Sequence, residues 1–553
     1  MAATVVVVGA GLAGMRAALA AARAGAHVTI IAKRAGPAGG VSGQAQGASA
    51  VLGRPDGGTE TDHAADTIEG GHGLPDPSLV AAFVADAGPR LRELEALGAR
   101  FSRDTEGLIR QVRMPGHRYP RSISSGTNLG AEITTALASA VARTPGIEMR
   151  DGVSAVRLVV NQGEVRGIIV RDEQTGEVQG IAAGSVVIAS GGLLDLFRPR
   201  AFPAPDLSAD GYAIALLAGA ELVDMEFTQF FPTALIWPAA VAPLIWVGAL
   251  RYDCDAHLLD ADGGRFMDRY DPVSMELATR DVVTRAIVTE VRAGRGTPHG
   301  GVWMSVEHVA PERVGAFLRD TFPRGIVGGH DLRAAGVDLA RDRIEVGPIA
   351  HFQMGGIRID SFGATSVPGL FAAGEVAGGL HGANRIEDNA VGEALVFGAR
   401  AGAAAAEHAC DASAASLAMP RVRAVAVPAW VGETTCDLCA AVVTALGPVR
   451  TGRELASAAA AIADVRAELD RRWPPDVVAP AEAARLRAAV LTAGVMVAAA
   501  VRREESRGSH YRLDHPTEGG ASWARSLVVH DDGTGPIVQE PTAPSGLPPR
   551  ADS

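Results

Sequence analysis

The feature that most constrains the fold is a glycine-rich turn near the N-terminus, placed between a predicted strand and a predicted helix. Thr4–Val8 is a continuous β-branched run, which is typical of a buried parallel strand. Residues 9–14 follow with the spacing GxGxxG, and an Ala-rich stretch to about Ala24 predicts a helix. A second strand is predicted at His27–Ala32. This order predicts an α/β fold with a Rossmann-like domain, because the glycines let the backbone approach a pyrophosphate at the helix N-terminus.

The nucleotide that suits this turn is FAD rather than NAD. The end of the second strand holds Ala32 and Lys33, so it lacks the acidic residue that binds a ribose in NAD sites. Far downstream, the buried run Leu370–Ala373 ends on a glycine and Glu375, which is expected near the ribitol of a flavin. A helix that begins at Asn384 is expected to point its N-terminus at the flavin ring. Two separated contact segments fit a long cofactor such as FAD.

The composition of the chain limits the other classes of function. Lys and Arg number 51 against 63 Asp and Glu, and the net charge of -12 argues against a nucleic-acid partner. Among four cysteines, Cys436 and Cys439 form a CxxC without two further ligands, so no metal site is predicted. No secretory signal precedes the first strand, and the apolar run Val495–Val501 is too short to cross a bilayer. We therefore expect a cytoplasmic protein without a transmembrane segment.

A series of ordered motifs resembles the superfamily of fumarate reductases, succinate dehydrogenases and L-aspartate oxidases. The motifs run from VVVVGAGLAG and QAQGASAVLG through DMEFTQFFPTAL, HFQMGGIRID and FAAGEVAGGLHGANR to the late REESRGSHYRLDHP. The resemblance implies a FAD-binding domain in two pieces, 1–232 and 351–405, around an α+β capping domain at 233–350. It also implies a C-terminal helical domain at 406–531. Residues 532–553, rich in Gly, Pro and Ser, are expected to form a loose tail.

The same resemblance implies a hydride transfer between flavin N5 and a small carboxylate substrate. Arg280, in TRDVV, matches the family's catalytic arginine, which donates or accepts a proton. His351 and Arg385 match ligands of one substrate carboxylate, for which the planar guanidinium of arginine is well suited. The residues expected to contact FAD are Gly9, Gly11, Leu12, Ala13, Gly14, Ala32, Lys33, Ser42, Gln46, Gly47, Ala48, Ser190, Gly191, Asp210, Glu375, Asn389 and Val391.

Two departures from the family pattern concern the flavin and the substrate amino group. Val41 stands in the stretch where the family has the histidine that binds flavin covalently, so we expect FAD to be non-covalent. Met114 replaces the acid that aspartate oxidases of this family use for the amino group of their substrate. Met114 and the nearby His117 are expected to line the substrate pocket.

Three further departures concern the far end of the substrate. Phe231 replaces a substrate histidine, and Trp246 and Val247 replace a Thr-Glu pair whose Glu belongs to the proton relay. A far carboxylate buried against these apolar side chains without a partner would cost roughly several kcal/mol. The pocket therefore predicts an uncharged far group, and Asp253 or Asp255 is a candidate for the lost relay acid.

Three other functions remain open from the sequence. The chain could be an L-aspartate oxidase, or a succinate dehydrogenase or fumarate reductase flavoprotein subunit that passes electrons to an iron–sulfur or other electron-transfer partner. It could also be a FAD-binding scaffold without turnover, although the joint presence of Arg280, His351 and Arg385 argues against this.

Overall fold

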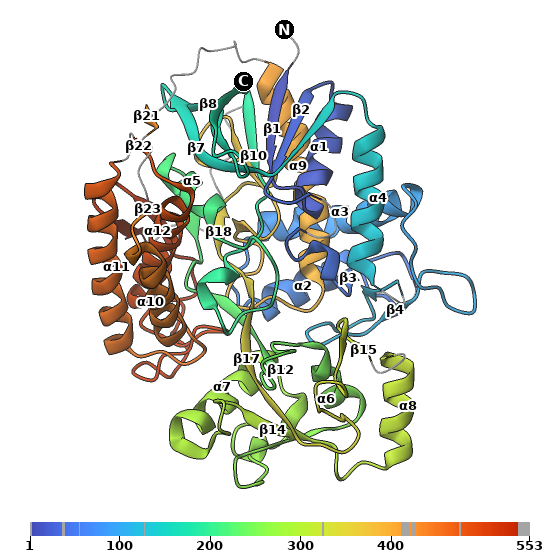
Figure 1. Cartoon of the computed structure of the whole chain (residues 1–553). Helices are drawn as coiled ribbons and strands as arrows, with labels where there is room; N and C mark the ends of the chain where they lie inside the picture. The colour runs from blue at the N-terminus through green and yellow to red at the C-terminus, as the bar shows by residue number, and fades with distance from the viewer. Residues whose placement is uncertain are drawn as a thin grey trace.

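The fold combines a FAD-binding body, a capping domain beneath it and a helical C-terminal body (Figure 1). The structure is a computed structural model, and it describes residues 3–35, 39–54, 56–125, 128–322, 326–410, 421–422, 427–474 and 477–539.

The centre of the FAD-binding body is a parallel five-stranded sheet with the strand order β19, β10, β1, β2 and β6. In that order, the strands span Leu370–Ala372, Ser185–Ile188, Thr4–Val8, His27–Ala32 and Ile147–Asp151. Helix α1 (Leu12–Arg23) leaves the glycine turn and packs against the long helix α9 (Asn389–Cys410). The predicted βαβ unit is therefore confirmed, and the valines of β1 are withdrawn from water.

Helix α9 starts later than the sequence analysis expects. Residues from Asn384 to Asp388 form a turn, and the helix begins at Asn389. The reason is local, because Asp388 has a φ of 64°, which a right-handed helix cannot contain. The side chains of this turn are thereby free to point away from the helix axis.

Further helices and small sheets complete the FAD-binding body. The helices are α2 (Glu60–Gly70), α3 (Pro77–Ala96), α4 (Leu129–Arg143) and α5 (Asp210–Leu217). One small sheet contains β3 (Ala48–Ser49), β5 (Ser122–Ile123) and β4 (Gln111–Val112), and another contains β7 (Val153–Asn161), β8 (Glu164–Asp172) and β9 (Val178–Ala182).

The capping domain is built on a four-stranded sheet and is α+β, as expected. Its strands, in spatial order, are β12 (Thr228–Leu235), β17 (Ile344–Gln353), β14 (Val302–Ser305) and β13 (His257–Leu259). Its helices are α6 (Ala249–Asp253), α7 (Arg280–Glu290) and α8 (Pro311–Thr321), and a short hairpin joins β15 (Ile326–Val327) to β16 (His330–Asp331). Strands β12 and β17 run side by side into the FAD-binding body, so the expected boundaries at 233 and 350 fall inside these two strands (Figure 1).

In its described residues, the C-terminal body contains three helices and also contributes strands to the FAD-binding body. The helices are α10 (Trp430–Ala445), α11 (Gly452–Arg472) and α12 (Ala481–Arg502), and β21 (Arg421–Val422) pairs with β22 (Val477–Val478). A mixed sheet has the order β20 (Ala377–Gly378), β18 (Gly356–Arg358), β11 (Leu222–Val223), β23 (Val528–Asp531) and β24 (Pro536–Gln539).

The expected loose tail at 532–553 is wrong for its first residues. Residues 536–539 form β24, which pairs antiparallel with β23, while β23 pairs with β11 of the FAD-binding body. The cause is the hairpin itself, because β24 satisfies the backbone groups along the outer edge of β23. Residues 540–553 lie outside the described part of the chain.

Helix α12 is the one helix of the described residues that is long and apolar enough to cross a membrane, with a mean hydropathy of 1.6. Its 22 residues correct the expectation that the apolar run around Val495–Val501 is too short. Within its most apolar stretch, 67% of the residues are buried, and the helix packs against α11 and α5. This is the setting of a core helix in a folded body, and the absence of a transmembrane segment stays a prediction.

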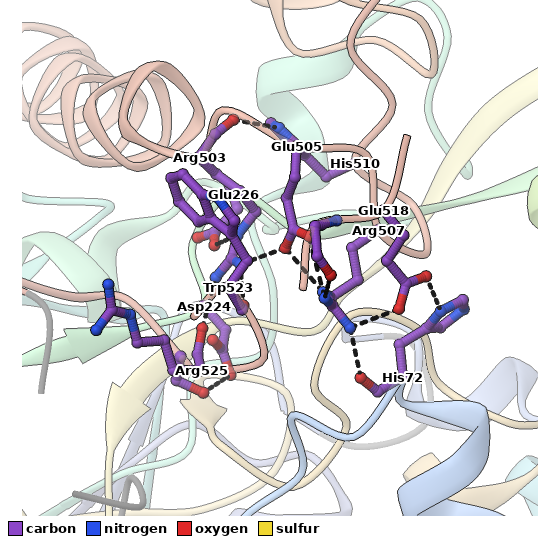
Figure 2. A network of polar contacts seen from close by, with 12 residues as sticks. His72, Asp224, Glu226, Arg503, Glu505, Arg507, His510, Glu518, Trp523 and Arg525 are labelled. Atoms are coloured by element: carbon purple, nitrogen blue, oxygen red, sulfur yellow. Dashed lines mark hydrogen bonds and ion pairs between the residues drawn. The ribbon is translucent and has the colours of Figure 1, made fainter. Parts of the chain in front are cut away.

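A buried network of charges joins the C-terminal body to the FAD-binding body (Figure 2). The guanidinium of Arg503 donates to Glu226 at 2.6 Å and to Glu505 at 2.9 Å, and all three side chains are shielded from water. Glu505 in turn accepts from Arg507 at 2.8 Å. Burial and the neighbouring Glu226 raise the pKa of Asp224 to about 7. A buried charge that loses its partner is costly, so this network fixes how the two bodies meet.

We predict that Glu226→Gln lowers the free energy of unfolding by about 3 kcal/mol, because it removes the charge opposite the buried Arg503. The matched control is Glu518→Gln, whose carboxylate pairs with Arg507 but is 48% exposed, and it should cost less than about 1 kcal/mol. Urea unfolding of both variants measures the two costs. Equal losses would show that the burial of the Glu226 pair does not matter for stability.

Candidate active site

A single cavity of about 700 Å³ extends from the N-terminus of α1 to the capping domain. Most residues expected to contact FAD line it. They are Gly9, Gly11, Leu12, Ala13, Ala32, Lys33, Ser42, Gln46, Gly47, Ser190, Gly191, Asp210, Glu375 and Val391.

Three expected FAD contacts lie behind the cavity wall instead. A Cβ on Gly14 would lie 1.9 Å from the carbonyl oxygen of Gly9, so Gly14 allows the turn to pack against its own helix. Ala48 is completely buried in β3. The amide oxygen of Asn389 bonds to His63 at 3.0 Å, which places this side chain in the support of the site.

The nucleotide end of the cavity has the properties that a FAD pyrophosphate needs. Gly9 has a φ of 108°, and a Cβ there would lie 2.2 Å from the carbonyl oxygen of Ala189. Helix α1 begins after Gly11 without a side-chain cap, apart from Ser42, whose Oγ accepts from the Leu12 amide at 3.2 Å. Free amides and the positive end of the helix dipole then face the cavity, which favours a bound anion. The residues present therefore fit FAD.

Two titratable groups line the cavity at positions expected to contact FAD. Lys33 donates to the Oγ of Ser208 at 2.6 Å and pairs with Asp210. Glu375 accepts from the backbone N–H of Gln353 at 3.1 Å, and burial raises its pKa to about 7.

The other end of the cavity brings together the predicted substrate residues. Arg280 starts α7, His351 and Phe231 come from the paired strands β17 and β12, and Arg385 lies in the turn before α9. Trp246 and Met114 also line the cavity.

Two predicted substrate residues do not line this cavity. Val247 is fully buried in the core of the capping domain, so it cannot contact a substrate. The ring of His117 is buried behind the cavity lining, where its Nε2 bonds to the carbonyl oxygen of Glu387 at 2.8 Å. The sequence analysis expects both side chains in the pocket because they stand in motifs that resemble the family's substrate segments. The tertiary fold turns them away from the cavity.

The two arginines differ in their charge partners. Arg280 pairs with the carboxylate of Glu387, and its Nη2 lies 2.7 and 2.6 Å from the two oxygens. Burial lowers the pKa of Arg280, but Glu387, Tyr252 and Asp388 together outweigh burial, so the pKa is raised. Arg385 is 7% exposed, and within the described residues its guanidinium has no carboxylate partner. Arg385 is therefore the guanidinium that is open to an anionic ligand.

Gln229 on β12 holds the two arginines in place. Its side-chain oxygen accepts from Arg385 at 2.8 Å and from Arg280 at 3.4 Å. Its amide nitrogen donates to the carbonyl oxygen of Arg385 at 2.8 Å. The sequence analysis does not predict a role for Gln229, because it takes only Phe231 from the segment DMEFTQFFPTAL.

His351 supplies an uncharged polar group to the same end of the cavity. Burial lowers the pKa of His351 well below its usual value, and the positive Arg280 and Arg385 lower it further. The imidazole is therefore neutral at pH 7, and its Nδ1 has no hydrogen-bond partner among the described residues. It can bond to a bound carboxylate or carbonyl without adding charge.

The site also contains two acids that the sequence analysis missed. Glu387 and Asp388 line the cavity directly after Arg385. Burial and the adjacent Glu387 raise the pKa of Asp388 to about 6. The available signal was their position inside the segment Phe371–Gly402 that resembles the family, two and three residues after Arg385.

The two candidates for the lost relay acid fall in different places. Asp253 lines the cavity, and burial raises its pKa. Asp255 is exposed and pairs with Arg313 at 2.8 Å outside the cavity, so it is wrong as a relay acid.

The fold and the site define a flavoprotein oxidoreductase. The family described as FAD binding domain matches residues 4–391, and the family described as fumarate reductase flavoprotein C-term matches residues 437–552. FAD is accordingly the cofactor of this chain.

Known relatives specify the family further. The chain is 37% identical to a subunit of the fumarate reductase (CoM/CoB) of Methanothermobacter marburgensis over 540 residues, covering 95% of this chain and 96% of that protein. It is 37% identical to L-aspartate oxidase of Caulobacter vibrioides over 516 residues, covering 92% and 93%. The solved structure of Sdh1 of Mycobacterium smegmatis matches at 31% identity with a TM-score of 0.84, covering 98% and 94%. The chain belongs to the flavoprotein family of fumarate reductases, succinate dehydrogenases and L-aspartate oxidases, and is a FAD-dependent oxidoreductase.

We predict that acid precipitation releases FAD, because the hydrocarbon side chain of Val41, which lines the cavity, cannot bond covalently to a flavin. The expected result is a colourless pellet and a yellow supernatant, with FAD identified by its absorbance and mass. A yellow, fluorescent pellet would show that another residue forms a covalent link.

Proposed function

We propose that the enzyme oxidises or reduces a C–C or C–N bond next to the carboxylate of a small substrate whose far end is uncharged. The observation that carries this proposal is the contrast between two guanidiniums at one end of the cavity. Arg280 is neutralised by Glu387, whereas Arg385 is buried without a carboxylate partner among the described residues. One open guanidinium suits one carboxylate, because a buried cation without a partner is costly until an anion binds.

The residues of the site then have separate tasks. Bound FAD supplies hydride transfer at N5. Arg385 and the neutral His351 bind and orient the carboxylate, and Arg280 donates or accepts the proton on the carbon next to the one that exchanges the hydride. Gln229 keeps both guanidiniums at a fixed separation, since its side-chain oxygen accepts from each.

The far end of the pocket favours an uncharged group. The ring of Phe231 lies beneath the guanidinium of Arg280 at 5.2 Å and packs against His351 with a centroid distance of 5.9 Å. Trp246, Ile245 and Met114 add further apolar surface to the cavity. Contact with such surface contributes roughly 25 cal/mol per Å² buried.

The experiment that tests this function is an anaerobic panel of carboxylates. The oxidised enzyme is mixed with saturated candidates to follow flavin bleaching, and the reduced enzyme with unsaturated candidates to follow reoxidation. No flavin response to any carboxylate would overturn the proposal.

A second candidate is a flavoprotein subunit that passes electrons to an iron–sulfur partner. It is favoured by the Methanothermobacter relative, which is itself named as one subunit of a fumarate reductase and matches this chain nearly end to end. The other alternative is an L-aspartate oxidase, which the Caulobacter relative favours. Against it, this chain has Met114 at the position expected to hold the acid for the substrate amino group. Oxygen consumption by the purified chain alone distinguishes a self-sufficient oxidase from a subunit that needs an electron-transfer partner.

We predict that Arg280→Lys retains FAD but loses turnover by several orders of magnitude. Lysine keeps the charge but not the planar fork that contacts both Glu387 and Gln229. The control is Arg313→Lys on α8, outside the cavity, which should behave as wild type. A loss within about tenfold for Arg280→Lys, or about 1.4 kcal/mol of barrier, would exclude Arg280 as the proton-transfer group.

We predict a higher kcat/KM for a monocarboxylate or half-amide than for the matched dicarboxylate. Succinate, fumarate and L-aspartate should be poor substrates, because their second carboxylate would face Phe231 and Trp246. The double substitution Phe231→His with Trp246→Thr should shift the ratio toward the dicarboxylate.

A clear preference of the wild-type enzyme for the dicarboxylate would contradict this view of the pocket. It would direct attention to Arg251, which is 1% exposed and has two nitrogens without hydrogen-bond partners.

A further inference from the structure

Glu387 is held against Arg280 by the surrounding structure, although the two residues come from different domains. Its carboxylate contacts the guanidinium through both oxygens, at 2.7 and 2.6 Å. Its backbone is fixed as well, because the carbonyl oxygen accepts from His117 Nε2 at 2.8 Å.

The protonation state of His117 fixes the direction of its hydrogen bond to Glu387. Arg121 donates to Nδ1 of His117 at 3.1 Å, so the ring proton must be on Nε2, which faces Glu387. Burial lowers the pKa of His117, which keeps the ring neutral. Arg121 is itself paired with the buried Asp66 at 2.7 Å. A chain of buried polar contacts from Asp66 through Arg121 and His117 thus holds the backbone of Glu387 in place.

Among the described residues, no other acid forms an ion pair or hydrogen bond with Arg280. The residue that stands where the family has its relay acid is Val247, and it points into the core of the capping domain. Asp253 lines the cavity, but no ion pair or hydrogen bond joins it to Arg280 in the described part of the chain. Glu387 is the carboxylate in contact with the catalytic guanidinium.

An arginine needs such a contact in order to transfer a proton. A guanidinium holds its proton too tightly to release it to water, with a pKa above about 12. The proton can move only if another group takes or supplies one at the same time, through a short hydrogen bond. The Glu387 side chain is 18% exposed, and it lines the cavity as well as contacting Arg280.

We propose that Glu387 is the relay acid that exchanges protons between Arg280 and solvent, a role that rests on the proposed function. In reduction, bound FAD would supply the hydride, and Arg280 gives a proton to the neighbouring carbon. Glu387 returns a proton to Arg280 and takes one from water. In oxidation, each proton moves in the opposite direction and bound FAD would take up the hydride.

Three charged groups surround Glu387. Arg280, Arg385 and Asp388 all face this region, and Asp388 accepts from the Oγ of Ser122.

The test compares Glu387→Gln with Glu387→Asp, using wild-type enzyme and the best carboxylate of the panel. Glu387→Gln keeps the shape of the side chain and one acceptor oxygen but cannot relay a proton, so kcat should fall by about a hundredfold or more. KM should not rise, because Arg385 and His351 still bind the carboxylate and Arg280 loses the carboxylate that neutralises it. Glu387→Asp should recover a clear part of kcat, and the limb of the pH profile that depends on the relay should vanish only in Glu387→Gln.

The controls separate the relay from structural effects and from the proposed function. Asp255→Asn, outside the cavity, should match wild type, and the FAD content of every variant is measured. If Glu387→Gln keeps wild-type kcat across pH while Arg280→Lys does not, the relay is overturned and the proposed function stands. If Glu387→Asp is as inactive as Glu387→Gln, the role is structural and the relay is overturned. If wild-type enzyme acts on no carboxylate, the relay and the proposed function are both overturned.

Discussion

The site depends on the close packing of α1 against α9. A Cβ on Gly398 would lie 2.6 Å from the carbonyl oxygen of Ala13, and one on Gly402 would lie 2.1 Å from that of Ala17. These glycines, one helical turn apart, let the two backbones touch. The N-terminus of α1 and the turn before α9 are therefore brought to the same cavity. The first is suited to the FAD pyrophosphate, and the second carries Arg385 and Glu387.

The second constraint is the pair of strands that joins the two domains. Strands β12 and β17 continue from the capping domain into the FAD-binding body, and their pairing shifts register between Phe231 and Ala234. Phe231 and His351 lie in this junction, so the position of the capping domain sets the shape of the substrate end. Arg280 comes from the capping domain as the first residue of α7. A cation is unfavourable at a helix N-terminus, and the contact with Glu387 offsets that cost.

The charges of the site are arranged in two unequal groups. In the Arg280–Glu387 pair, the two charges cancel. Among the described residues, the Arg385 guanidinium contacts only uncharged groups, namely Gln229, a backbone carbonyl and the ring of Phe352 at 4.7 Å. Such an arrangement leaves the attraction for one anion uncompensated. Elsewhere in the described chain, the buried network around Arg503 is matched by Glu226 and Glu505, which fits a structural role.

The sequence by itself determined the βαβ unit, because glycine spacing and apolar runs act locally. FAD and the family were indicated by two separated contact segments and by the resemblance of many ordered motifs to known flavoproteins. Most of the site residues that the sequence named line the cavity, including Arg280, His351 and Arg385. Only the tertiary structure decided which neighbours of these motifs face the cavity. Val247 turns into the capping core, His117 supports Glu387 from below, and β24 is a strand because β23 offers it an edge. The Glu387–Arg280 contact joins residues 107 positions apart, and no local pattern encodes a contact between two domains.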